Sequence, residues 1–356
     1  MNTLILFLIF VLTGFSVMYI TYKPQTDKYS QTLQFSYRMF PMPYIYAIFA
    51  LGSVTAYFVS DNSDFVERLT FIRFLTPLII APIIYLACIL SGRITATVIT
   101  TIGIALTIFM QPIGSGNAYP EIAVWQLQLI VLIFSCIYCL LGGLNNFIPH
   151  TFIIPKVFIM LGLVIMAFLN STPLYIALCA GILAGVLIAY LSINFYEVKI
   201  EIDNPTAITV SYMVCSLLLI NLGELCFPSC IILTAVFWAE LLVAIWRRIF
   251  ITRAGSLTEN TNYYLAAQNI SIKAMVLSLF KICTIIIFLA WFQLYSINGY
   301  SLFLIALCIA LWLNGSMVLP NGGKRSLGEI NREFISNIKQ GIKETTDLLN
   351  KKRKDD

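Results

Sequence analysis

Long apolar runs separated by short polar connections make up most of the chain. Each run is close to the roughly 20 residues that a helix needs to cross a bilayer core of about 30 Å. No run alternates like a barrel strand, and a helix satisfies its own backbone hydrogen bonds in lipid. The pattern therefore predicts about eleven transmembrane helices, near residues 3–21, 43–59, 72–91, 95–112, 122–143, 152–169, 174–193, 207–225, 229–246, 274–295 and 300–318.

Composition supports the same class. Hydrophobic residues are 59% of the chain and charged residues 11%, whereas charged residues supply about a quarter of a soluble domain. We therefore expect an all-α polytopic integral membrane protein whose transmembrane domain occupies residues 1–320. The first apolar run lacks the basic leader and small-residue cleavage site of a signal peptide, so we expect it to be retained as a helix.

Residues 321–356 have a different character. Ser326 and Glu329 form a capping-box pattern, and apolar residues then recur at three- and four-residue steps through Ile342. The pattern predicts an amphipathic helix over 327–349 with a basic face. Such a helix suits the anionic inner leaflet, and a coiled coil with a partner protein is the alternative.

Positive charge predicts the orientation. If the amino terminus is outside, all but three of the 22 lysines and arginines belong to the inner face or the tail, as the positive-inside rule requires. Lys156 is counted among the inner-face residues. The exceptions are Arg68 and Arg73 on the outer face and Lys281 within a crossing. The positive charge is thus the ordinary inner-face excess, and no nucleic-acid partner is expected.

The polar connection 194–207 stands out because it gathers Glu197, Glu201 and Asp203 around Lys199. Charges this dense need water or a polar ligand. The segment is therefore either one wall of a site or a solvated loop in which the carboxylates pair with the lysine.

Glu240 is the second candidate, because a carboxylate inside a membrane helix is costly in lipid and faces protein or water. It either marks a site or is satisfied by Arg247, two helical turns further on, or by a nearby hydroxyl. Asn146 follows the fifth crossing in a segment typical of turns. His150, the single histidine of the chain, follows a proline and is expected at the surface.

Two stretches resemble bacterial polyprenyl-phosphate sugar-1-phosphate transferases, the superfamily of undecaprenyl-phosphate N-acetylglucosamine-1-phosphate transferase and of translocase I of peptidoglycan synthesis. Pro228, an apolar helix, Glu240 and then Arg247-Arg248 are similar to that family's proline, helix, aspartate and Arg-Arg. Asn194-Phe195 followed by Lys199-Ile200 is similar to a family loop that ends in a metal-binding aspartate.

Several positions depart from the family pattern, and the family's acidic and histidine positions carry other side chains. Ser91-Gly92 precedes Arg93 where the family carries two aspartates, and Asn204 takes the place of the metal-binding aspartate. Asn146-Phe147-Ile148 matches the family, but Pro149-His150 follows instead of Asp-Gly. Asn260-Thr261-Asn262-Tyr263 stands where the family has His-x-His-His.

The resemblance implies a bacterial inner-membrane protein whose relatives transfer a sugar phosphate from a UDP-sugar to undecaprenyl phosphate, with Mg²⁺ neutralising the phosphate charge. The substrate-binding positions it implies are Arg93, Asn146, Lys199, Asn204, Arg247 and Arg248. Because the acidic and histidine positions are substituted, we expect a catalytically degenerate homologue without a cofactor. It would bind polyprenyl phosphate, or act as partner or regulator of an active transferase in lipopolysaccharide, O-antigen or peptidoglycan assembly.

Two other functions stay open. In an active transferase, Mg²⁺ would bind a rebuilt site at Asp203 and Glu240, with Asp203 brought into the ligand position by a one-residue shift. In a membrane carrier, Glu240 and Lys281 would line a pathway, although the chain lacks the internal repeat common in carriers. A homodimer is also left open.

Overall fold

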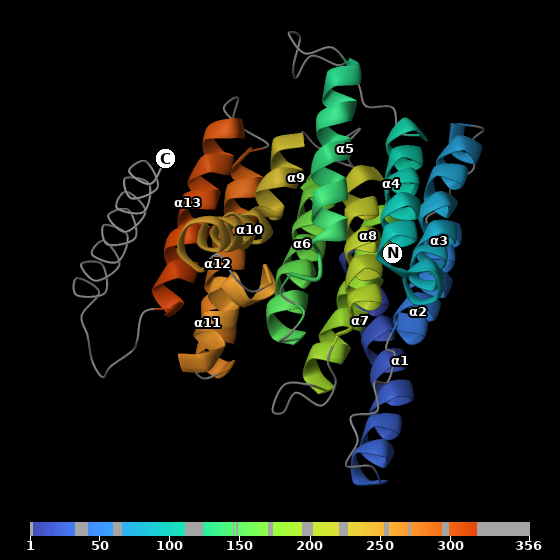
Figure 1. The fold of residues 1–356 in the computed structure, drawn as a ribbon. Helices are drawn as coiled ribbons and strands as arrows, with labels where there is room; N and C mark the ends of the chain where they lie inside the picture. The colour runs from blue at the N-terminus through green and yellow to red at the C-terminus, as the bar shows by residue number, and fades with distance from the viewer. Residues whose placement is uncertain are drawn as a thin grey trace, which may run out of the picture.

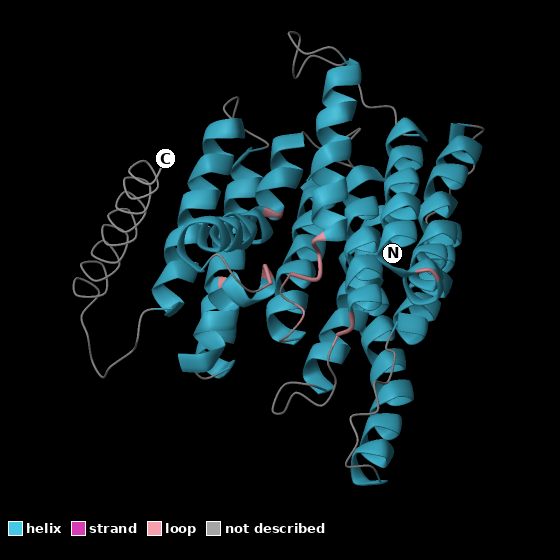
Figure 2. Ribbon diagram, in the orientation of Figure 1, coloured by secondary structure: helices cyan, strands magenta, loops and turns pink. Residues whose placement is uncertain are grey.

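The computed structural model describes residues 3–32, 42–59, 66–110, 124–144, 146, 149–169, 174–193, 202–220, 227–252, 256–269, 272–293 and 299–318. All regular structure within these residues is helical (Figure 2), which confirms the predicted all-α class. The Lys199 candidate and the predicted tail helix lie outside the described residues.

Every predicted crossing overlaps a helix, and the predicted crossing 229–246 corresponds to two helices. Figure 1 shows the helices standing side by side as a bundle, with α1 reaching beyond its neighbours at one end. The helices are α1 (Thr3–Thr32), α2 (Met42–Val59), α3 (Val66–Leu90), α4 (Gly92–Met110), α5 (Val124–Leu140), α6 (Pro149–Leu169), α7 (Leu174–Ile193), α8 (Asn204–Ile220), α9 (Phe227–Leu233), α10 (Ala235–Trp246), α11 (Asn262–Asn269), α12 (Ile272–Gln293) and α13 (Gly299–Val318).

Three of the described helices contain stretches that are long and apolar enough to cross a membrane, namely Pro149–Met166, Leu174–Ile193 and Ala274–Gln293. Seven further described helices are apolar over 10–17 residues. Large apolar side chains such as Leu90, Ile94 and Phe58 are exposed, as expected for surfaces that face lipid. These features indicate a membrane protein.

Helix α7 is the most enclosed part of the bundle, with almost all of its side chains buried, and it packs against α1, α2 and α6. Glycines make the contact with α1 close. A Cβ added at Gly181 would lie 2.7 Å from the Phe7 ring, and one at Gly185 would overlap the carbonyl oxygen of Val11. Small residues allow membrane helices to approach in this way.

The predicted crossing 229–246 is broken at Thr234, between α9 and α10. The Thr234 hydroxyl donates to the Ile231 carbonyl at 2.9 Å and accepts from the indole nitrogen of Trp238 at 3.0 Å. Figure 1 shows the chain changing direction here, because α9 runs upright while α10 is seen nearly end-on. The break points the carboxyl end of α10 toward the segment that leads into α11.

One sequence-based expectation is wrong. His150 was expected at the surface, but its side chain is fully buried at the start of α6. Lys156, counted with the inner-face charges, lies two turns into α6 and is 6% exposed. Both are buried by packing of α6 against neighbouring helices, which apolar periodicity along the chain does not report.

Candidate functional site

Glu240 is fully buried on α10, and its carboxylate binds the beginning of α11. The backbone N–H of Asn262 donates to Oε2 at 2.8 Å, and the Asn262 side-chain amide donates to Oε1 at 3.2 Å. Asn262 is the first residue of α11, where backbone N–H groups have no partner within the helix. The carboxylate thus supplies both an acceptor and a negative charge at the positive end of the helix.

Arg247 completes this network without bonding Glu240 itself in the contacts described. Its guanidinium donates to Oδ1 of Asn262 at 2.7 Å and to the carbonyl oxygen of Asn260 at 3.3 Å. Asn262 therefore bridges the carboxylate and the guanidinium. The sequence offered Arg247 or a hydroxyl as the partner of Glu240. The structure shows an electrostatic interaction of Arg247 with the carboxylate, and it adds hydrogen bonds from an asparagine distant in sequence.

The segment before α11 is held in place by its own polar side chains. Ser256 and Glu259 exchange hydrogen bonds between side chain and backbone at 3.3 Å, which is a capping box around the short helical turn Thr258–Asn260. The Thr261 hydroxyl accepts from the N–H of Tyr264 at 3.2 Å and so caps α11. The Ser-x-x-Glu spacing was a readable signal for this turn.

Tyr263 fastens α11 to α13. Its hydroxyl donates to Oδ1 of Asn314 at 3.1 Å, and both side chains are fully buried. Burial, together with the nearby Glu240 carboxylate, raises the pKa of Tyr263 well above its usual range. The phenol therefore stays protonated and keeps its role as a donor.

A second group of candidates surrounds a cleft of about 660 Å³. Asn204, at the start of α8, and Arg248, just after α10, both line it, together with residues 256–258. Asn146 lies behind Asn204, because its amide donates to Oδ1 of Asn204 at 3.0 Å and to the carbonyl oxygen of Ile202 at 2.9 Å. The fold thus brings together three of the predicted substrate-binding residues from separate connections.

Close packing of the turn after α5 shapes this cleft. A Cβ at Gly142 would overlap the Ser211 side chain, and one at Gly143 would lie 3.2 Å from Oδ1 of Asn204. Both glycines therefore let the turn lie directly on α8. The cleft wall formed by Gly143 and Leu144 depends on this approach.

The two candidate metal ligands do not meet in one site among the described contacts. Both oxygens of Glu240 accept from Asn262. Asp203 interacts electrostatically with Tyr85 and Cys88 on α3, and its Oδ1 is buried without a hydrogen-bond partner. Within the described part of the chain, no group of three or more His, Cys, Asp or Glu residues could hold a metal ion. Mg²⁺ prefers carboxylates with open positions, and the arrangement around Glu240 does not fit it.

Asn204, rather than Asp203, is the residue that lines the cleft and bonds Asn146. The Arg93 side chain lies outside the described part of the structure.

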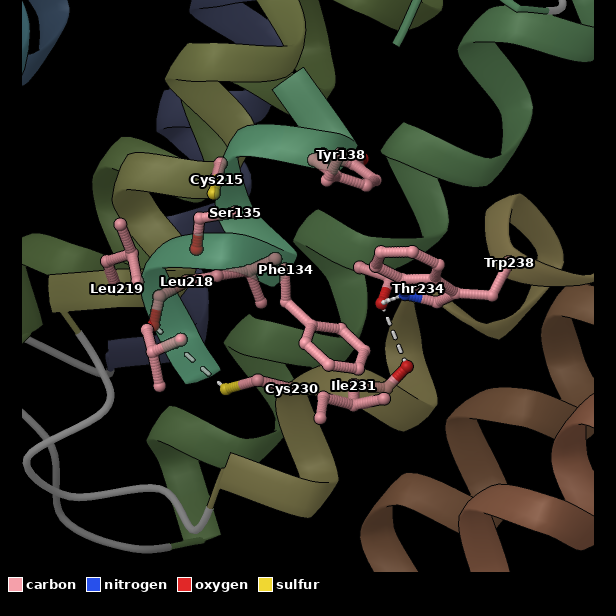
Figure 3. A pocket seen from close by; sticks show the side chains of 11 residues that line it. Phe134, Ser135, Tyr138, Cys215, Leu218, Leu219, Cys230, Ile231, Thr234 and Trp238 are labelled. Carbon is pink, nitrogen blue, oxygen red and sulfur yellow. Dashed lines mark hydrogen bonds between the residues drawn. The ribbon is translucent and has the colours of Figure 1, made fainter. Parts of the chain in front are cut away.

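An apolar cavity of about 40 Å³ lies near the break in the ninth predicted crossing, between α5, α8 and the α9–α10 junction (Figure 3). Phe134 packs edge-on against Trp238 with ring centroids 4.8 Å apart. Cys215, Leu218 and Ile231 form other parts of the wall. The cavity is almost wholly apolar, so it suits a hydrocarbon group.

A third cavity, of about 20 Å³, is lined in part by Lys156, the one buried lysine among the described residues. It shares Tyr138 and Thr234 with the apolar cavity and Leu144 with the cleft. Lys156 enters it from α6. Sequence reasoning missed this residue as a site candidate, although a lysine within an apolar run was a readable signal.

In comparisons with known proteins, no family model matched the chain, and no curated protein or solved structure was similar to it.

Proposed function

We propose that this chain is a multi-pass protein of the bacterial inner membrane that binds polyprenyl phosphate and is catalytically impaired as a sugar-1-phosphate transferase. It would serve as partner or regulator of an active transferase in cell-envelope polysaccharide assembly. In this proposal the chain crosses the membrane eleven times with its amino terminus outside, so that the cleft opens toward the cytoplasm.

The observation that carries the proposal is the chemistry of the cleft. Its described lining offers the guanidinium of Arg248, the amide of Asn204 and the hydroxyls of Ser256 and Thr258, but no carboxylate. Arginine and neutral donors suit a phosphate, whereas Mg²⁺-assisted transfer requires carboxylates to hold the ion. The lining therefore favours binding of a phosphate-bearing ligand over transfer chemistry.

The state of Glu240 supports the same conclusion. Its carboxylate joins α10 to α11 through Asn262, so its described bonds have a structural role. To hold a metal, it would have to give up or share bonds that hold a buried charge, and losing them is costly.

The apolar cavity beside the Thr234 break supports a lipid ligand in particular. A prenyl chain is a branched hydrocarbon, and burial of its methyl and methylene groups against Phe134, Trp238 and Ile231 is favourable. A soluble sugar nucleotide has no group that would use this cavity.

Three measurements on the purified protein test the proposal. Undecaprenyl phosphate is expected to bind, and Arg248→Gln to weaken that binding, whereas Lys281→Met on the exposed face of α12 serves as a control without effect. No transfer of radiolabelled sugar phosphate from UDP-sugars is expected with Mg²⁺ or Mn²⁺. Turnover that Glu240→Gln abolishes would instead establish the active transferase, and solute uptake into proteoliposomes would favour the carrier. Absence of lipid binding refutes the proposal.

A further inference from the structure

Lys156 is an unusual residue because its amino group is buried without an acidic partner. It is 6% exposed, and no carboxylate among the described residues forms an ion pair with it. Its ammonium donates to the Phe152 carbonyl oxygen at 3.4 Å, near the long limit for such a bond. A lysine has three donors, so most of its hydrogen-bonding capacity is unused in the described contacts.

Aromatic rings provide the other interactions of Lys156. Nζ lies 3.5 Å from the centroid of the Phe152 ring and 5.9 Å from that of Tyr138. Cation–π contacts of this kind are favourable, but they offset only part of the cost of taking an ammonium out of water. An anion that reaches the ammonium would supply the missing compensation.

Lys156 lines the small cavity of about 20 Å³ together with Thr151 and Thr234, which is room for a single phosphate oxygen. Tyr138 and Thr234 also line the apolar cavity, and Leu144 also lines the cleft. The small cavity therefore borders both the region suited to hydrocarbon and the region open to polar groups.

Resting on the proposed lipid binding, we propose that Lys156 binds the phosphate of the ligand. Arg248 would contact the same phosphate from the cleft, but with a smaller contribution, because exposed charges are solvated and screened by salt. A buried ammonium in an apolar wall interacts more strongly with a phosphate oxygen. The shared chemistry is that of a phosphate group, carried either by a lipid or by free phosphate.

The test compares probes that carry the phosphate group, the hydrocarbon chain or both. Binding of geranyl phosphate, of the uncharged alcohol geraniol and of inorganic phosphate is measured on the full-length protein in detergent, by equilibrium dialysis. The variant Lys156→Met keeps the length and apolar stem of the side chain, and Lys281→Met is the matched control. We expect Lys156→Met to reduce the preference for geranyl phosphate over geraniol by about tenfold or more, as for a lost hydrogen bond to a charged group, and Lys281→Met to leave it unchanged.

The outcomes separate this inference from the proposed function. If the native protein binds geranyl phosphate and Lys156→Met retains its preference over geraniol, the Lys156 inference is overturned while lipid binding stands. If the native protein binds neither lipid nor inorganic phosphate, both fail. If inorganic phosphate binds as tightly as geranyl phosphate, and Lys156→Met abolishes that binding, the oxyanion site is supported and its ligand is free phosphate.

Folding of the variant is checked by its thermal unfolding midpoint. Replacing an unpaired buried charge by an apolar residue is expected to leave the unliganded protein as stable as before or more so. Geranyl phosphate is expected to raise the midpoint of the native protein and not that of Lys156→Met. An equal rise in both would contradict the role of Lys156.

Discussion

Asn262→Ala gives the most direct test of how the Glu240 network holds α10 to α11. The substitution removes the 3.2 Å bond from the side-chain amide to Glu240 and the 2.7 Å bond from Arg247 to Oδ1, and it leaves the 2.8 Å backbone bond in place. It therefore leaves a fully buried carboxylate with one donor fewer and removes the hydrogen-bonded bridge to the guanidinium.

The expected loss follows from these two bonds. A hydrogen bond to a charged group contributes about 1.5–3 kcal/mol. Glu240 has no access to replacement water, so the full loss applies to it, whereas the partly exposed Arg247 recovers some hydration and its loss is smaller. We therefore expect Asn262→Ala to lower the free energy of unfolding by about 2–4 kcal/mol.

The assay is equilibrium unfolding of the detergent-solubilised protein, with Glu240→Gln and the double variant completing a thermodynamic cycle. Because the two residues are in contact, their effects are expected to be non-additive by about 1 kcal/mol or more. Thr258→Ala, in the same segment, is the control and is expected to change stability by less than about 0.5 kcal/mol. The reasoning is refuted if Asn262→Ala changes the free energy of unfolding by less than about 0.5 kcal/mol, or if the effects of Asn262→Ala and Glu240→Gln are additive.

Four further substitutions test contacts elsewhere. Gly142→Ala is expected to lower the free energy of unfolding by about 1–3 kcal/mol through overpacking and to weaken ligand binding at the cleft, because the added Cβ would overlap Ser211. Gly143→Ala, whose nearest contact would be 3.2 Å, should lower it by less. Equal losses in the two variants would contradict this. Gly185→Ala is expected to lower thermal stability by a similar amount, since its Cβ would meet the Val11 backbone; an unchanged melting midpoint would show that α1 moves aside freely. Asn204→Asp should change unfolding by less than about 0.5 kcal/mol, because an aspartate oxygen still accepts from Asn146, and it should not create transfer activity by itself; turnover in this variant would argue for a latent metal site.

The amino-acid sequence by itself determined the class of this protein and the approximate position of its helices. In lipid each helix must satisfy its own backbone and present apolar side chains, so local hydrophobicity carries most of the information. The predicted segments at 174–193 and 300–318 accordingly match α7 and α13 closely. That each helix crosses the membrane, and which end of the bundle faces inward, stay predictions.

Tertiary structure alone decided how the polar residues are paired and which of them are buried. The partner of Glu240 is Asn262, 22 residues away, and no periodicity connects them. The break at Thr234 depends on a side-chain bond to Trp238 and on packing against α5. Lys156 and His150 are buried because neighbouring helices cover them. Burial and pairing depend on which helix faces come together, and an apolar run that is hydrophobic on every side does not specify that choice.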